Sequence, residues 1–134
     1  MSESNALQRL IFERLSSFAA VTAIVGTRIA DAPPSTLAQP SITFGASDAV
    51  IEDFTCFSGR VETIQIDCWS EAQDGKREVK ALTDAVYHAL HLYSAEPVDG
   101  ALVLMRVTMM RVLDDPAGGH HGVVQVEAEM EDAA

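Results

Sequence analysis

The stretch DDPAGGHHGVVQVEAEM, residues 114–130, gathers the residue types from which metal sites and acid–base centres are built. Carboxylates and imidazoles are common zinc ligands, and carboxylates alone bind hard cations. The Asp-Asp-Pro-Ala-Gly-Gly segment at 114–119 is equally typical of a tight turn. Adjacent residues of a strand point to opposite faces, so His120 and His121 are poorly placed to share one ion. The pattern therefore favours a β-hairpin over a metal centre.

A second set of metal-ligand types lies on the helix predicted between Asp74-Gly75 and Pro97. Its members, spaced i, i+4 and i+7 on one helix face, are Asp84, His88 and His91. Three such side chains can in principle converge on a zinc ion. The alternative is the solvated face of an amphipathic helix, because the opposite face carries an apolar stripe. We favour the solvated face, since the sequence offers no group to orient these ligands or a substrate.

A row of carboxylates, Glu127, Glu129 and Glu131, alternates with apolar residues near the C-terminus. Neighbouring carboxylates can serve as a general acid and base or bind a hard cation. More often such a row is the solvated face of a strand, whose charge opposes aggregation. Nucleophile-elbow, P-loop, GxGxxG and HExxH motifs do not occur. We therefore assign no catalytic, metal or cofactor-binding residue and expect no enzyme activity.

The cysteines and the net charge narrow the function classes further. Cys56 and Cys68 have neither CxxC spacing nor a nearby histidine cluster, so we interpret them as reduced thiols. Nine basic against twenty acidic residues give a formal net charge of −11. Because proteins that hold DNA or RNA usually need a basic patch, nucleic-acid binding is not expected. The lack of a signal-peptide layout and of an apolar run of about 20 residues predicts folding in the cytoplasm and no membrane partner.

The length of 134 residues fits a single domain, 1–134. Helical spacing predicts an amphipathic helix from a cap at Ser2 or Ser4 to Phe18, in addition to the helix before Pro97. Period-two alternation predicts strands over 42–46, 60–70, 103–109 and 124–130, with a brief strand at 28–30. The segment over 48–59 is irregular, with a candidate strand end at 49–51. The predicted fold is α+β, with two amphipathic helices packed on one face of a mainly antiparallel sheet of four to five strands.

The last two strands should form a hairpin centred near residues 117 and 118. This centre pairs Val107 with Ala128 on the core side and Arg106 with Glu129 on the other side. A slip by one residue would bury glutamates, so the side that each residue faces is better determined than the register.

In the order of its elements and in several short segments, the chain resembles the small tail-terminator (tail-completion) proteins of long-tailed phages and of phage-derived gene transfer agents. The matching segments are AIVGTRI at 23–29, a proline loop leading to QPSI at 39–42, IQIDCWS at 64–70, a long helix, and RVLDD at 111–115 leading to HGVV at 121–124. Together they extend over almost the whole chain.

The resemblance implies a structural protein without a cofactor. Members of this family form a hexameric ring at the head-proximal end of the tail tube, stop its elongation and join it to the capsid neck. The implied partners are further copies of the chain, the major tail tube protein and a head–tail connector or neck protein, with DNA passing through without specific binding. The implied location is the neck end of the virion tail, after assembly in the bacterial cytoplasm. A head-completion or connector protein of the same particle is the neighbouring alternative, and a small metal- or ligand-binding protein is the contrasting one.

A ring subunit needs an exposed strand edge or helix face to join its neighbour. Phe54, Phe57 and Trp69 are candidate subunit contacts, because large apolar side chains at a surface mark interfaces. The alternative for Phe54 and Phe57 is burial within their own subunit. The glutamate row is a candidate channel lining, where an acidic wall would repel DNA and let it slide.

Overall fold

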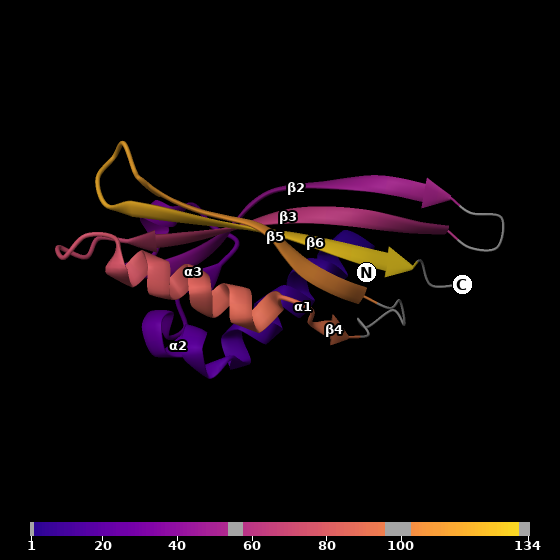
Figure 1. Ribbon diagram of the computed structural model, residues 1–134, viewed down its shortest axis with the longest axis horizontal. Coiled ribbons are helices and arrows are strands. Elements are labelled where there is room, and N and C mark those ends of the chain that lie inside the picture. The colour runs from indigo at the N-terminus through magenta and orange to yellow at the C-terminus, as the bar shows by residue number, and fades with distance from the viewer. Residues whose placement is uncertain (1, 54–57, 96–102, 132–134) are drawn as a thin grey trace.

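The computed structural model describes residues 2–53, 58–95 and 103–131. The helices are α1 (Glu3–Ser17), α2 (Ala19–Val25) and α3 (Arg77–Leu90), with a 3₁₀ turn, η1, at Pro34–Thr36. The strands are β1 (Ile29–Ala30), β2 (Ser41–Asp53), β3 (Ser58–Ser70), β4 (Ser94–Ala95), β5 (Val103–Asp114) and β6 (His120–Glu131). The three α-helices lie on one face of a curled sheet, and the β2–β3 and β5–β6 arms extend toward opposite ends of the long axis (Figure 1). No helix in these ranges is long and apolar enough to cross a membrane.

The α+β class is confirmed, but the strand and helix counts differ from the prediction. Within the described ranges the sheet has six strands in the order β1-β2-β3-β6-β5-β4, and every neighbouring pair except β1–β2 is antiparallel. The brief strand predicted at 28–30 is β1, and the additional strand is β4; both have two residues and lie at the two edges of the sheet. A third helix arises because Phe18 takes an extended conformation that ends α1 and begins α2.

The core lies between the helices and the covered face of the sheet. The periodicities predicted from the sequence are confirmed, because α1 and α3 bury their apolar stripes and β3 buries alternate residues. The fully buried large side chains include Leu7, Ile11, Leu15, Ile42, Ile66, Leu82, Leu90 and Met105. Each such side chain stabilises the fold by about 1.5–3 kcal/mol relative to exposure.

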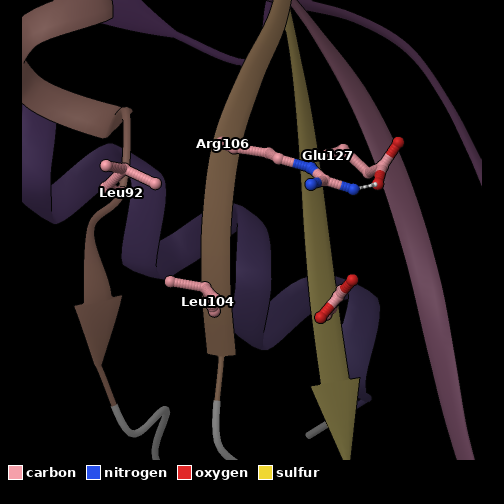
Figure 2. Close-up of a pocket in the computed structure, with 5 residues that line it drawn as sticks. Leu92, Leu104, Arg106 and Glu127 are labelled. Carbon is pink, nitrogen blue, oxygen red and sulfur yellow. Dashed lines mark hydrogen bonds and ion pairs between the residues drawn. The ribbon is translucent and has the colours of Figure 1, made fainter.

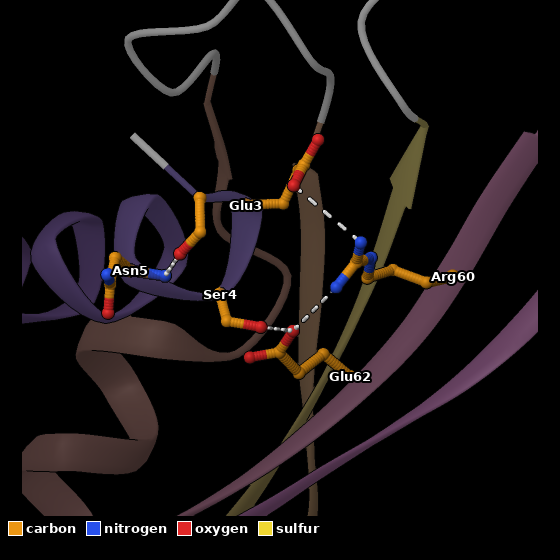
Figure 3. A network of polar contacts seen from close by, with 6 residues as sticks. Glu3, Ser4, Asn5, Arg60 and Glu62 are labelled. Carbon is orange, nitrogen blue, oxygen red and sulfur yellow. Dashed lines mark hydrogen bonds and ion pairs between the residues drawn. The ribbon is translucent and has the colours of Figure 1, made fainter.

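Polar contacts fasten the start of α1 to β3 (Figure 3). The hydroxyl of Ser2 accepts from the backbone N–H of Asn5 at 3.1 Å, so Ser2 is the helix cap. Ser4 Oγ donates to Glu62 Oε1 at 2.7 Å, and Arg60 Nη1 lies 3.8 Å from the same oxygen. Because Glu62 is only 2% exposed, these partners offset the cost of burying its charge. The network fixes the first turn of α1 to the start of β3.

The β5–β6 hairpin turns through Asp115 to Gly119, as predicted. Gly118 and Gly119 have φ of 103° and 83°, a conformation that favours glycine. The predicted register is wrong by two residues, because Val107 pairs with Val126 and Arg106 pairs with Glu127. A β-bulge between Val107 and Met109 accounts for one of the two residues, since it adds a residue to β5 that has no partner on β6, and the other arises because the turn is centred on Ala117. The faces of Glu127 and Glu129 are nevertheless as predicted.

Candidate assembly surface

The face of the sheet opposite the helices, here called the open face, holds most of the residues considered for function. Cross-strand partners share a face, so the row Thr43, Asp67, Val123 and Arg111 belongs to it. The row through Asp48, Thr63, Glu127 and Arg106 belongs to it as well.

Trp69 anchors a polar cluster on the open face. Its indole stacks on the imidazole of His121, with ring centroids 4.0 Å apart and an interplanar angle of 6°. The indole N–H donates to Thr43 Oγ1 at 2.9 Å. His121 Nε2 lies 2.7 Å from Asp67 Oδ1, which also accepts from Gln65 Nε2 at 2.8 Å. Trp69 is thus half-buried by its own subunit, and its predicted role as a subunit contact would involve only the remaining exposed edge.

The Asp67–His121 pair has the geometry of an acid–base dyad, but the adjacent thiol is not available to it. Cys68 points to the opposite, covered face and is completely buried. Burial raises the pKa of this thiol well above its usual range, and the neighbouring Asp67 carboxylate raises it further. The thiol therefore stays protonated and unreactive at neutral pH. The cluster serves as a structural brace between β2, β3 and β6.

Glu127 and Glu129 of the glutamate row lie on the open face, because Val126 and Ala128 beside them are buried. Glu127 Oε1 accepts from Arg106 Nη2 at 2.9 Å, and this hydrogen bond, with the charge of Glu127, raises the pKa of the guanidinium. Glu129 is exposed and makes no ion pair within the described ranges. The side chain of Glu131 lies outside the described residues.

A shallow hollow occupies the open face beside this row (Figure 2). It is lined by Leu92, Leu104, Arg106, Glu127 and Glu129. The two leucines are exposed and come from the segment before β4 and from β5 itself. The hollow thus combines two leucines with the carboxylate of Glu127, paired with Arg106, and that of Glu129, which has no ion pair among the described residues. This combination suits a protein contact better than a chemical step.

The two adjacent histidines point to opposite faces, as predicted. His120 Nδ1 lies 3.3 Å from Asp114 Oδ1, and Lys76 Nζ lies 3.3 Å from the same oxygen. Hydrogen bonding and charge from Lys76, with a further hydrogen bond from His120, lower the pKa of the Asp114 carboxyl. These contacts tie the hairpin tip to the start of α3, while His121 belongs to the Trp69 cluster.

The helix triad Asp84, His88 and His91 is divided between solvent and a structural contact. Asp84 and His88 are exposed on α3. His91 stacks on Tyr87, and its Nδ1 accepts the backbone N–H of Val107 at 3.1 Å. In the described parts of the chain, no three histidine, cysteine or acidic side chains are grouped so that they could hold a metal ion.

Two strand edges were not recognised in the sequence. β2 is paired on its outer side only at Ile42 and Thr43, by β1, and β5 has no strand partner beyond Val107 on its outer side within the described ranges. Exposed apolar residues lie along both unpaired stretches. On β2, Val50 is 59% and Ile51 60% exposed, and on β5, Met109 is 39% and Met110 38% exposed. Phe54 and Phe57, predicted as subunit contacts, lie outside the described residues, as does Cys56.

Comparisons with known proteins agree on one assignment. The family described as tail completion protein gp17 matches residues 9–131. A chain in the structure described as the virion of native gene transfer agent (GTA) particle superposes with a TM-score of 0.81 and 26% sequence identity, covering 96% of this chain and 97% of that chain. No curated protein sequence matches.

Proposed function

We propose, since this chain belongs to the tail completion protein gp17 family, that it is the tail terminator of a phage-type particle. The chain is a structural protein of a phage or gene transfer agent tail. The proposal adds that six copies close a ring on the head-proximal end of the tail tube. The ring stops addition of tube subunits and presents its other rim to the neck of the capsid. Its partners are then the major tail tube protein and a connector protein, met in the bacterial cytoplasm.

The observation that supports this proposal best is the one-sided packing of the sheet. Among the described residues, the helices cover one face of the sheet and none lies on the open face (Figure 1). The four long strands place many polar and charged side chains on this open face. A ring of such subunits would place the helices outside and the sheets around a channel. Heterologous contacts between copies close into a ring when the rotation between neighbours divides a full turn.

The test of the terminator role is the length of the tails. Deleting the gene in the producing strain should yield tubes of variable and excessive length by negative-stain electron microscopy, and a plasmid copy should restore a single length. Tails of normal length that fail to join heads would contradict termination and indicate a connector. Labelling a tagged copy should place it at the head-proximal end of the tube.

The acidic residues of the open face support a second part of the proposal, in which DNA slides along a repelling wall. Because Arg106 neutralises Glu127, the carboxylate to change is Glu129, which is exposed and unpaired within the described ranges. Glu129→Lys should slow DNA delivery while tail length stays normal. Asp84→Lys is the matched control, since it makes the same charge change on the exposed face of α3. Equal delivery by both variants would contradict the wall.

A further inference from the structure

We propose that the subunits of the ring join by strand pairing. The free half of β2, which follows Thr43, in one copy lies antiparallel to the free half of β5, which follows Val107, in the next copy. The inference rests on the proposed ring and names the surface that builds it. β2 and β5 are the outer long strands of one sheet, so each copy would offer one edge and accept the other. Unpaired strand edges present rows of N–H and C=O groups that readily pair with another chain.

The two edges are free in complementary halves. On β2 the start of the strand is paired by β1, at Ile42 and Thr43. On β5 the first half is covered by β4, by the carbonyl of Tyr93 and by His91 Nδ1, which accepts from Val107. Because β2 and β5 run in opposite directions, their free second halves lie at opposite ends of the sheet. Neighbouring copies must therefore join with a stagger along the strands.

Side chains on the two free halves match in one register. With Asp48 opposite Arg111 of the next copy, a carboxylate meets a guanidinium, and neither makes an ion pair within the described ranges. The same register puts Val50 opposite Met109, so two exposed apolar side chains cover each other on the open face. It also puts Ala49 opposite Met110 on the other face. A shift by one residue would place the members of each pair on opposite faces.

The stagger that this register requires is the one that a closed barrel needs. In one copy Asp48 lies in the row of Glu127, and Arg111 lies in the row of Val123, so the two rows are four residues apart on β6. Four residues at about 3.4 Å give a shift of about 14 Å, across four strands about 19 Å wide. The corresponding strand tilt is about 36°, within the roughly 35–45° of β-barrels.

The charges of the two edges favour a second copy of this chain as the partner of β2. The chain carries twenty acidic and nine basic residues, so the acidic β2 edge, with Asp48 and Glu52, repels most of the surface of another copy but not its Arg111. Arg111 is one of the few basic residues that the strands expose. Its position on the opposite edge gives each copy both halves of a complementary joint.

Cysteine trapping in assembled particles tests the register. Particles are produced with the Val50→Cys and Met109→Cys variant in a Cys56→Ser background, since facing residues on antiparallel strands fall within disulfide distance. Mild oxidation should give a ladder of covalent oligomers that ends at the hexamer on non-reducing gels. Val50→Cys with Met110→Cys is the matched control, because Met110 points to the other face, and it should give no ladder.

Charge exchange provides an independent test of the same pair. Asp48→Arg and Arg111→Asp, made singly, should each lower the yield of capped tails by about tenfold, and the double variant should restore it. Both positions are exposed, so thermal melts should show unchanged folding. Tails of uniform length with no ladder from the first pair would overturn the strand-pairing inference and leave the terminator role intact. Unchanged tail length after gene deletion would overturn the terminator role itself.

Discussion

Gly122→Ala should loosen α3 from the sheet. A Cβ built on Gly122 would lie 2.4 Å from Thr83 Cγ2, 3.0 Å from Val79 Cγ2 and 3.3 Å from Cys68 Cβ. Ordinary carbon contacts are about 3.5–4.0 Å, so the helix or the strand must move by about 1 Å. Overpacking of a tight core costs about 1–3 kcal/mol, and two of these three contacts are very close. We therefore expect a loss of about 2–3 kcal/mol, or a fall in Tm of roughly 8–12 °C at about 4 °C per kcal/mol.

The partner substitution separates this clash from other effects. Thr83→Ser removes the nearest methyl group but keeps the hydroxyl that donates to the Lys80 carbonyl at 3.0 Å. Alone it should cost about 1 kcal/mol or less, as for the loss of one buried methyl group. The Gly122→Ala/Thr83→Ser double variant should be more stable than Gly122→Ala by about 1 kcal/mol in urea denaturation. An unchanged Tm for Gly122→Ala, or no recovery in the double variant, would refute the packing described for α3.

The shifted pKa values of Cys68 and Asp114 give two further predictions. With Cys56→Ser in place, Cys68 should resist alkylation by iodoacetamide at pH 8 until urea unfolds the chain, since burial raises its pKa, and rapid modification in mass spectra of the folded protein would contradict this. The Asp114 carboxyl should titrate below its usual range by carbon NMR, because Lys76 stabilises its charged form. Since the folded pKa is lowered, its support of the hairpin tip should be complete above the ordinary aspartate pKa and be lost as pH falls through the lowered value. In Lys76→Met the titration should return toward the ordinary range.

The sequence predicted the covered half of the molecule well, because burial imposes periodicity. The α3 stripe and the alternation of Ile64, Ile66 and Cys68 correspond to residues that are buried in the structure. The second half of β2 was predicted as irregular except for a candidate strand end at 49–51, although it is a strand to Asp53. Its residues from Ser47 to Glu52 are exposed on both faces, so no face selects apolar residues and the period-two signal vanishes.

The sequence predicted the face of the sheet on which the candidate residues lie, but not the residues that they contact. The open-face position of Trp69 follows from strand alternation, whereas its stacking on His121 depends on β3 and β6 being neighbours, which local patterns do not encode. The pairing of Arg106 with Glu127 instead of Glu129 depends on a bulge that carries neither glycine nor proline as a signal. Strand edges are a property of the whole sheet, and therefore the free halves of β2 and β5 had no signature in the sequence.

The two-residue strands at the borders of the sheet limit which assemblies are possible. Without β1 and β4, two copies would align flush along the full length of their outer strands, and successive copies would add side by side as an open ribbon. In the proposed ring, β1 beside Ile42 and Thr43 and β4 beside Val103 and Leu104 would act as register stops that leave only a staggered alignment. Each step carries the next copy along the strand direction, which inclines the strands to the axis and lets the series return to its starting point. Four residues in two minor strands would thus decide between a finite ring and an endless sheet.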